Sequence, residues 1–373
     1  MSRFLRCLRA AVLIVALLSS SLAPQRVSAQ QVPASGFPGL VWAVLNFNQH
    51  KDNSTQPPVG TPIALVAIGA ALLFLPSIIE IVGHSLGSGP VAVLSCPVFI
   101  GGSTLLGEDG CAWAKAGMGW TQQEGVAIQR AAYRAGGQAE IAPGWFLGGT
   151  LGAANQTTQG MATLGTGQSF DVAVALKYSQ DALLLAGSAG FTANWSRFSG
   201  TPGILSDVDV TNQTAQVHLR GAYDFAFDGW YVRPRLDVDI AYRNMPGFQV
   251  KSQGVTVMSV GSFSQTNFSA TPMVEIGGRL DVEDTGMIFR PYVAVGASFL
   301  PGNTSTFNVQ FAGPLAFIGS FQPYLQGPSV TANVEAGVQL YRGRGLEFRA
   351  EYGLITGSSL LSQTAALRAA WHF

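Results

Sequence analysis

Polar and apolar residues alternate along many segments in the C-terminal two thirds of the chain. The clearest is the segment 230–242, whose charged and apolar residues occupy opposite parities: Arg233, Arg235, Asp237 and Asp239 against Val232, Pro234, Leu236, Val238 and Ile240. The same alternation recurs at 330–340, which contains Glu335, and at 346–352. Because successive side chains of a strand point to opposite faces, each segment is predicted to be a strand with one polar and one apolar face.

The connections between these segments alternate in length and composition. Turn-forming residues make short connections at 142–144, 179–181, 227–229, 283–286 and 342–345. Longer connections rich in Gly, Ser, Thr and Asn occur near 156–167, 197–212, 244–267, 301–327 and 355–363. Short turns on one side and long loops on the other are typical of bacterial outer-membrane β-barrels.

The assignment that keeps all short turns on one side contains twelve strands. Their approximate ranges are 111–121, 125–140, 145–156, 168–178, 182–196, 213–225, 230–243, 268–282, 287–300, 328–341, 345–355 and 364–373. Taking 253–265 as a strand would put short turns on both sides of the membrane, so 244–267 is predicted to be an outside loop. The predicted fold is all-β: a twelve-stranded antiparallel transmembrane β-barrel over 111–373, preceded by a short, partly helical N-terminal segment.

The polar faces of these strands would line the lumen of the barrel. A soluble β-sandwich would instead turn them to water, and alternation alone does not separate the two cases. The charged residues expected in the lumen are Arg233, Arg235, Asp237, Asp239, Glu335, Arg349 and Glu351. Two roles stay open for them: tuning the passage of ions, or pairing with one another to stiffen the interior. We favour pairing, because a twelve-stranded barrel has little free lumen when a chain segment occupies it.

The composition of the chain supports a membrane protein without long apolar blocks. Charged residues make up 11% of the sequence, 45 residues are Gly, and the mean hydropathy is positive. Soluble domains usually carry about 25% charged residues. The 21 basic and 21 acidic side chains balance, and removal of residues 1–29 would remove four arginines and no acid. This balance gives no reason to expect a nucleic-acid partner, whose usual footprint is a basic patch.

The N-terminal residues 1–29 have the pattern of a secretory signal peptide. Arg3, Arg6 and Arg9 precede an apolar run from Ala10 to Leu18, and small residues follow before Gln30. A charged segment, a short apolar segment and a small-residue cleavage site are the three parts of such a signal. The alternative is an N-terminal membrane anchor, for which the apolar run is short. We therefore expect export and cleavage of residues 1–29.

Residues 30–110 are interpreted as a short linker or passenger-like segment. Its first half is rich in Pro, Gly, Gln and Asn, and an apolar stretch follows at 63–82. Twenty such residues are long enough to span a membrane as a helix, although Pro76 and Glu80 interrupt the stretch. The alternative is a helix or strand pair that docks in or under the mouth of the barrel.

One short motif points to enzymatic chemistry. Gly83–Gly87 matches G-x-S-x-G with Ser85 at the nucleophile position, as in α/β-hydrolases. That fold needs alternating strands and helices and a later histidine, whereas His218 and His372 lie on predicted barrel strands. Ser85 is therefore a weak candidate, and we predict no enzyme activity and no cofactor. The histidines and cysteines show no metal-ligand spacing, so no metal site is predicted either.

Two cysteines remain after residue 29. Cys96 and Cys111 lie 15 positions apart in a chain that is expected to reach an oxidising compartment. A disulfide between them is the favoured interpretation, and two free thiols are the alternative.

The last predicted strand ends in an aromatic residue. Leu367, Ala369, Trp371 and Phe373 share its lipid-facing side, and Phe373 is the final residue. This ending looks like the C-terminal signal by which the barrel-assembly machinery recognises outer-membrane barrels for insertion. The resemblance makes that machinery and outer-membrane lipid the expected partners.

The stretch from about 111 to 373 resembles the autotransporter (type V secretion) outer-membrane β-barrel domain. The segments that carry the resemblance are CAWAKAGMGW, GGQAEIAPGWFLGGTLGA, WYVRPRLDVDIAY, MVEIGGRLD followed by MIFRPYVAVGASF, and the terminal AWHF. The resemblance implies a twelve-stranded barrel that holds one chain segment in its lumen, and export of an N-terminal passenger. The chain departs from that pattern in its short N-terminal segment, which has no 20–50-residue repeat.

These observations lead to three hypotheses. The first is an autotransporter-like translocator in the outer membrane of a Gram-negative cell, which presents a short N-terminal segment and its loops at the cell surface. The second is a porin-like channel for small solutes, and the third is a membrane-anchored hydrolase that uses Ser85. No residue pattern identifies an extracellular ligand.

Overall fold

The computed structural model describes residues 95–373, except 124, 161–163, 200–204, 283–285 and 343–344. The chain divides into two units, Met1–Pro62 and Ile63–Phe373, and all described residues belong to the second. The predicted signal peptide, the apolar stretch 63–82, the Ser85 motif and the expected helical part of the N-terminal segment lie outside the described residues. Among the described residues, no helix is both long and apolar enough to cross a membrane.

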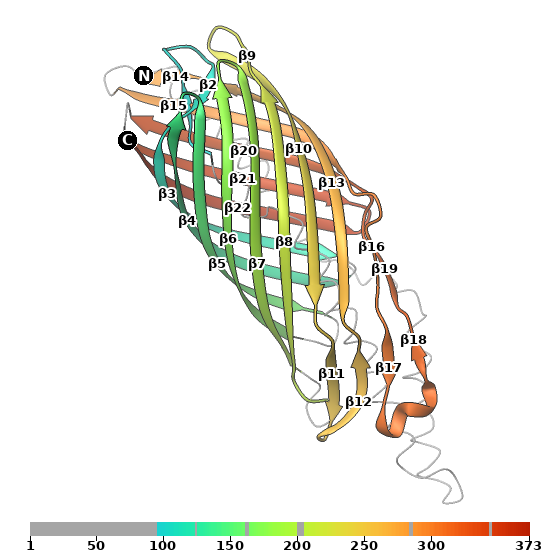
Figure 1. Ribbon diagram of the computed structural model, residues 1–373. Helices are drawn as coiled ribbons and strands as arrows, with labels where there is room; N and C mark the ends of the chain where they lie inside the picture. The colour runs from blue at the N-terminus through green and yellow to red at the C-terminus, as the bar shows by residue number, and fades with distance from the viewer. Residues whose placement is uncertain (1–94, 124, 161–163, 200–204, 283–285, 343–344) are drawn as a thin grey trace, which may run out of the picture. The chain divides into compact units, whose positions relative to one another are not determined.

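Twelve long strands in the described part of the chain form one closed antiparallel barrel (Figure 1). They are β3 (Cys111–Gln123), β4 (Val126–Ala142), β5 (Trp145–Gln159), β6 (Leu164–Gln180), β7 (Leu183–Ser199), β8 (Val208–Tyr223), β10 (Trp230–Met245), β13 (Phe263–Gly278), β15 (Met287–Phe299), β20 (Val330–Arg342), β21 (Leu346–Gly357) and β22 (Leu360–His372). Each strand pairs with the next in this order, and β22 pairs with β3 to close the barrel. Two short strands extend the sheet: β9 (Phe225–Ala226) beside β10, and β14 (Leu280–Val282) beside β15.

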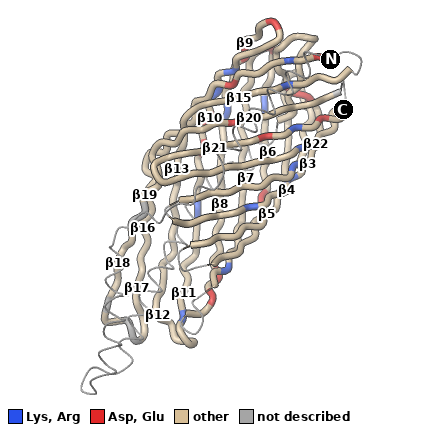
Figure 2. Tube along the Cα trace, turned by 180° about the vertical axis from the view of Figure 1, so that it is seen from behind, with Lys and Arg blue, Asp and Glu red and all other residues tan. Residues whose placement is uncertain are grey.

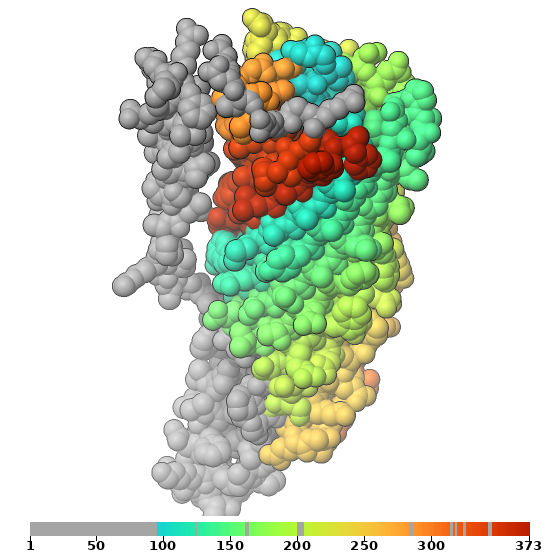
Figure 3. Space-filling view, turned by 90° about the vertical axis from the view of Figure 1, so that its left-hand side faces the viewer, coloured from blue at the N-terminus to red at the C-terminus, as the bar shows by residue number. Residues whose placement is uncertain are grey.

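The predicted all-β, twelve-stranded barrel is confirmed. Figure 3 shows the closing seam, where the last strand (red) lies along the first barrel strand (cyan). The structure corrects several strand limits at the long-loop end, where β8 begins at Val208 and β13 at Phe263, five residues earlier than predicted for each. Strand pairing begins before the first clearly alternating residues, so periodicity alone placed the starts of these two strands too late.

The outward face of the barrel is apolar and its inward face is polar. On β6, Val174 is 58% exposed, whereas the alternate residues Asp171 and Lys177 are 1% and 3% exposed. A soluble protein buries apolar residues and exposes charged ones, so this inverted arrangement is typical of a wall in contact with lipid. Strand alternation therefore sorts lipid-facing residues from lumenal ones along the chain.

The long loops at one end of the barrel fold into a separate sheet. The predicted outside loop 244–267 contains the hairpin of β11 (Phe248–Ser252) and β12 (Val255–Val260). The next long loop contributes β17 (Val309–Phe311), the 3-10 helix η3 (Gly313–Ile318) and β18 (Ser320–Phe321), and a pair is formed by β16 (Thr304–Thr306) and β19 (Tyr324–Gln326). β11, β12, β17 and β18 form a four-stranded sheet. We call it the loop-end sheet.

An apolar cluster joins the loop-end sheet to the barrel strands beneath it. It contains Phe198, Leu205, Val208, Val210, Met245, Val250, Val257, Met258, Val260, Phe263, Phe307, Val309 and Phe311, all at most 9% exposed. Lys251 is the one charged residue in 244–267, and 301–327 contains none. Figure 2 shows this scarcity of charge along β12, β17 and β18. The loop end is therefore held together by apolar packing.

A small hairpin lies at the opposite, tight-turn end. It consists of β1 (Pro97–Phe99) and β2 (Leu106–Glu108), which pair with each other and precede β3. Hydrogen bonds tie it to the barrel wall: Gln339 of β20 donates to the carbonyl of Pro97, and Thr104 donates to the carbonyl of Phe227. We call residues 95–110 the floor hairpin.

Candidate functional site

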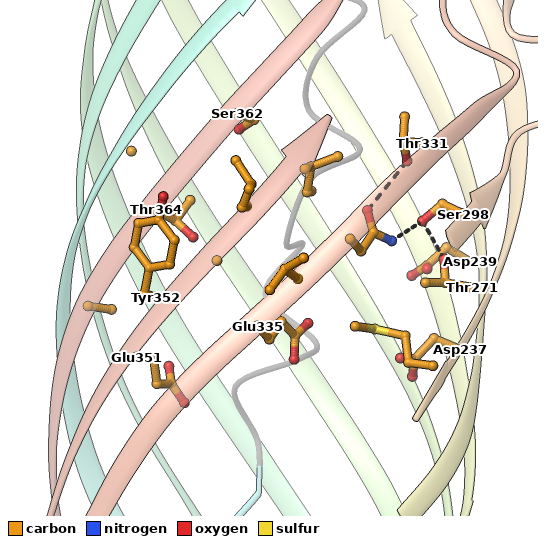
Figure 4. Close-up of a pocket in the computed structure, with 18 of the residues that line it drawn as sticks. Asp237, Asp239, Thr271, Ser298, Thr331, Glu335, Glu351, Tyr352, Ser362 and Thr364 are labelled. Atoms are coloured by element: carbon orange, nitrogen blue, oxygen red, sulfur yellow. Dashed lines mark hydrogen bonds between the residues drawn. The ribbon is translucent and has the colours of Figure 1, made fainter. Parts of the chain in front are cut away.

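The lumen of the barrel contains a cavity of about 490 Å³. All seven charged residues that the sequence placed in the lumen line it: Arg233, Arg235, Asp237, Asp239, Glu335, Arg349 and Glu351. Figure 4 shows Asp237 and Asp239 on one side of the cavity, with Glu351, Ser362 and Thr364 on the other. The structure also places other charged residues around the cavity: Lys115, Arg130, Arg134, Arg220, Glu275, Arg290 and Arg368.

On one side of the lumen, cross-strand neighbours carry opposite charges. The register between β8 and β10 puts Arg220 opposite Asp237 and His218 opposite Asp239. The Arg220 Nε donates to the Asp237 Oδ1 over 2.5 Å, and the His218 Nδ1 lies 2.8 Å from the Asp239 Oδ1. On the other flank of β10, Arg233 lies opposite Glu275 of β13. We call the lumenal faces of β8, β10 and β13 the paired wall.

The paired wall continues into a buried network around Glu275. The Glu275 Oε1 accepts hydrogen bonds from the Tyr231 hydroxyl and from the Arg290 Nη2, each over 2.6 Å. Arg290 also donates to the Tyr231 hydroxyl over 2.8 Å and to the Gln339 Oε1 over 2.7 Å. Because Gln339 bonds in turn to Pro97, this network connects the wall with the floor hairpin.

Arg235 of β10 connects the paired wall with Glu335 of β20. It donates to Glu335 of β20, and its Nε lies 3.6 Å from the Asp237 Oδ2. Arg349 lies 3.3 Å from both Glu347 and Glu351 on its own strand. These contacts give most of the charged residues expected from the sequence an oppositely charged partner.

The opposite side of the lumen has a different charge pattern. The register puts Arg368 of β22 opposite Lys115 of β3, and Lys115 opposite Arg134 of β4. Arg130 lies on the same face of β4. The one acidic residue on these three strands, Glu140, is exposed and accepts a hydrogen bond from Gly144 in the tight turn. We call the lumenal faces of β22, β3 and β4 the basic wall; β10 stands across the barrel from β3 in the strand order.

The floor hairpin is attached to the barrel by a disulfide and by a buried ion pair. Cys96 and Cys111 form the disulfide, with a Cα–Cα distance of 6.4 Å, and neither residue is exposed. The Glu108 Oε2 lies 2.8 Å from the Lys177 Nζ of β6 and also accepts a hydrogen bond from Gln138 over 2.7 Å. These contacts fix the hairpin to β3, β4 and β6 at the tight-turn end.

Burial and pairing act in opposite directions on the carboxyl group of Glu108. Burial favours its neutral form, but the charge of Lys177 and hydrogen bonds from Lys177, Ser95 and Gln138 favour the carboxylate. The second group of effects is larger, and it lowers the pKa of Glu108 to about 2. The carboxylate of Glu108 is therefore ionised over the whole physiological pH range.

The predicted assembly residues lie at the end of β22. Leu367, Trp371 and Phe373 are 60–68% exposed on the outward face, and Ala369 lies half-buried on the same face. The backbone N–H of Phe373 donates to the carbonyl of Gly110 over 3.1 Å. The aromatic terminus is thus accessible at the seam where β22 meets β3.

Among the described residues, the lumen holds no arrangement typical of a catalytic or metal centre. No group of three or more His, Cys, Asp and Glu residues could hold a metal ion in this part of the chain. The Ser269 hydroxyl hydrogen-bonds to Asp239, which also contacts His218, so the serine contacts the acid and not the imidazole. Nucleophilic catalysis by serine needs the opposite arrangement, with the base against the hydroxyl.

The sequence did not single out several residues that line the cavity. Glu275, Arg290 and Arg368 occupy lumenal positions of their strands, and Arg130 and Arg134 do so on β4. Alternation along the strands could have identified Arg130, Arg134 and Arg368, because each lies an even number of residues from other lumenal residues of its own strand. Their proximity across strands depends on register, which periodicity does not show.

The chain was compared with known families and structures. The model of the family described as autotransporter beta-domain matches residues 112–353. No curated protein sequence matches the chain.

Three solved structures share the fold. The translocator domain of the autotransporter NalP from Neisseria meningitidis is 11% identical, with a TM-score of 0.59, and the match covers 71% of this chain and 89% of that one. The transport unit of the autotransporter AIDA-I from Escherichia coli is 13% identical, with a TM-score of 0.55 and coverage of 80% and 97%. The beta domain of the Bordetella autotransporter BrkA is 17% identical, with a TM-score of 0.54 and coverage of 71% and 100%.

The match of the family model covers more than half of the chain. Autotransporter β-barrel domains reside in the outer membrane of Gram-negative bacteria, which agrees with the apolar outer face and polar lumen described above. The chain is an outer-membrane β-barrel and belongs to the autotransporter β-domain family.

Proposed function

We propose that this barrel displays its N-terminal segment and its long loops at the cell surface. The observation that carries the proposal is the position of Ser95 and Pro97, which line the lumenal cavity at the start of the floor hairpin. A route through the lumen for the chain that precedes Ser95 is part of this proposal. The expected helical character of that segment, and its presentation outside after removal of residues 1–29, are parts of this proposal.

Labelling of intact cells tests the display. Ser54→Cys introduces a thiol into the N-terminal segment, while Cys96 and Cys111 are held in the disulfide. A membrane-impermeant maleimide should label Ser54→Cys in intact cells. Phe317→Cys at the loop end, where Phe317 is 77% exposed, should also be labelled. Asp228→Cys in a tight turn should be labelled only after the outer membrane is permeabilised. Labelling of Ser54→Cys only after permeabilisation would contradict surface display.

We also propose that the exposed C-terminal aromatic directs assembly by the barrel-assembly machinery into outer-membrane lipid. Deleting Phe373 should sharply reduce the fraction of barrels that show a boil-dependent shift on gels of outer-membrane fractions. Phe317→Ala removes an aromatic residue at the other end that is 77% exposed, against 68% for Phe373, and should leave that fraction unchanged. Normal assembly of the truncated chain would refute the proposal.

A second candidate function is a channel for small solutes. The 490 Å³ cavity and its charged lining favour it. Discrete conductance in planar bilayers that changes in Arg233→Ala or Asp237→Ala would support a channel. The floor hairpin favours surface display over a channel, because a hairpin at the tight-turn end of the barrel would obstruct the passage of solutes.

We infer no enzymatic role. Ser85 lies outside the described residues, and the family is one of secretion domains. A serine-reactive probe that labels the wild-type chain but not Ser85→Ala would overturn this inference.

A further inference from the structure

One part of the lining of the lumenal cavity belongs to the basic wall. Its rim consists of Lys115, Arg130, Arg134 and Arg368, and its base of Gly117, Gly119, Ala132 and Ala366. The register places Gly117 between Ala132 and Ala366, so the smallest side chains of three strands meet at one point. A Cβ atom at Gly117 would lie only 3.1 Å from that of Ala366. We call this surface the basic recess.

The rim of the basic recess carries more positive charge than its neighbours neutralise. Lys115 contacts Glu351, and the Arg134 Nε lies 3.3 Å from the Asp171 Oδ2. Arg130 has a single hydrogen bond among the described residues, to the hydroxyl of Ser169 over 3.4 Å. No carboxylate in the described part of the chain forms a salt bridge with it.

Arg368 also lacks a carboxylate partner in the described part of the chain. It is 4% exposed, and it donates to the carbonyl of Ser95 and to the sulfur of Cys96. The Nε atoms of Arg368 and Arg130 are both buried without a hydrogen-bond partner among the described residues. The Nε atoms of Arg235 and Arg349 are also without an acceptor, but those two arginines contact carboxylates, whereas Arg130 and Arg368 contact none in the described part of the chain. A buried guanidinium without a carboxylate partner is costly, which favours an acceptor in the recess.

The cross-strand register shows that this excess of positive charge does not stabilise the sheet. Like charges directly opposite each other destabilise a sheet, and Arg368, Lys115 and Arg134 form such a row. The paired wall shows that this barrel neutralises charge by register elsewhere, with Arg220 opposite Asp237. Glu351 and Asp171 offset two of these three cations, but Arg368 and the nearby Arg130 have no carboxylate partner in the described part of the chain, and a ligand of opposite charge would supply one.

We propose that the basic recess binds an oxyanion group, a phosphate or a carboxylate, of a small organic anion in the lumen. Arg130 and Arg134 project from the same face of β4 with only Ala132 between them, so both guanidinium groups can reach one anion. Guanidinium donors match the geometry of both oxyanions. A cavity of 490 Å³ lies within the usual size of small-molecule sites.

The small number of acidic residues in the N-terminal segment argues against that segment as the occupant of the basic recess. Residues 30–94 contain two acidic side chains, Asp52 and Glu80, 28 positions apart in the sequence. A separate anion therefore fits the recess better than a segment of this chain. The proposal does not rest on surface display, because it depends only on the lumenal side chains.

Equilibrium dialysis tests the proposal. The full chain, refolded in a neutral detergent at low ionic strength, is dialysed against radiolabelled inorganic phosphate or succinate. Saturable binding of at least one probe is expected. The probe that binds more tightly tells a phosphate site from a carboxylate site. Arg130→Gln and Arg134→Gln should each weaken that binding about tenfold or more, the value of one charge-assisted hydrogen bond.

Arg197→Gln is the matched control. It removes one arginine that pairs with Asp209 on exposed strand residues outside the cavity, and it should leave binding unchanged. The boil-dependent gel shift establishes that each variant is folded before dialysis. The absence of saturable binding with both probes would overturn the proposal. An equal loss of binding in Arg197→Gln and Arg130→Gln would also overturn it, because binding would then follow net charge and not the recess.

Discussion

The paired wall and the basic wall of the lumen are built from the same kind of strand but carry opposite electrostatic patterns. In the paired wall, register places Arg220 opposite Asp237 and Arg233 opposite Glu275. In the basic wall, the register places three cations in a row. Charges that neutralise their neighbours stabilise a barrel, whereas Arg130 and Arg368 of the basic wall have no carboxylate partner in the described part of the chain. The comparison thus separates structural charge from candidate binding charge.

The largest effect is expected at the centre of the paired network. Glu275→Gln leaves Arg290 buried without its carboxylate, although Tyr231 and Gln339 keep their bonds to it. Breaking a buried ion pair from one side costs about 3–5 kcal/mol. Urea unfolding of the refolded barrel should show a loss of that size. Asp209→Asn removes the exposed partner of Arg197 and should cost at most about 1 kcal/mol. Equal losses would show that Glu275 is not a structural centre.

The floor hairpin, like the paired wall, pairs opposite charges. The ion pair between Glu108 and Lys177 can be tested by the pH dependence of stability. The pKa of Glu108 is held at about 2, below its ordinary value, so the pair stabilises the folded state above the ordinary pKa of a glutamate. That stabilisation is lost as the pH falls toward 2. A shift of this size corresponds to about 3 kcal/mol.

Comparison with Glu108→Gln isolates this contribution. The difference in unfolding free energy between the wild-type chain and Glu108→Gln should be constant from pH 8 to pH 5. It should then shrink as the pH falls from about 4.5 toward 2. A difference that already declines between pH 7 and pH 5 would mean that Glu108 titrates in the ordinary range and is not held by Lys177.

The same substitution on the two walls gives the sharpest contrast. Arg220→Gln removes the cation nearest to the buried Asp237, which keeps its longer contacts with His218 and Arg235, and should cost about 2 kcal/mol. Arg130→Gln removes a cation that has no carboxylate partner among the described residues and whose Nε is buried without an acceptor, so it should leave stability unchanged or raise it by up to about 1 kcal/mol. Urea unfolding of both variants under one set of conditions measures the difference. A similar loss in both would end the distinction between the walls.

The architecture could be predicted from the sequence because alternate residues of a barrel strand face the lipid and the lumen, and therefore differ in polarity. Asp237 and Asp239 were placed in the lumen because their neighbours Leu236, Val238 and Ile240 are plainly apolar. The turns then set the strand order, since tight turns and long loops alternate.

The residues of the basic wall were harder to identify, for two physical reasons. The segment around Arg130 and Arg134 is rich in Ala and Gly, so its outward face lacks the large apolar residues that make alternation visible. The row of cations also depends on the pairing of the first and last barrel strands, which lie over 200 residues apart in the sequence. Cross-strand register of that kind follows from barrel closure and not from local pattern.

The floor hairpin and the loop-end sheet were missed for a related reason. β1 and β2 have three residues each, too few for a period to be recognised. The loop-end strands β11 and β12 are rich in Val, but 244–267 was assigned as an outside loop because a strand at 253–265 would put short turns on both sides of the membrane. Their stability comes from the apolar cluster around Met245 and Met258, which forms only after distant loops meet.

The smallest expected effect concerns salt. Repulsion within the row of Arg368, Lys115 and Arg134 is reduced by mobile ions, so added NaCl should stabilise the wild-type barrel by a few tenths of a kcal/mol. Lys115→Met removes the central charge of the row and should abolish most of that gain, whereas Arg197→Gln should retain it. Urea midpoints at about 0.05 and 0.5 M NaCl measure the gain. If NaCl destabilises the wild-type barrel, the attraction of Glu351 and Asp171 to Lys115 and Arg134 outweighs the repulsion within the row. In that case the basic wall is a second paired wall, and the difference between the two sides of the lumen disappears.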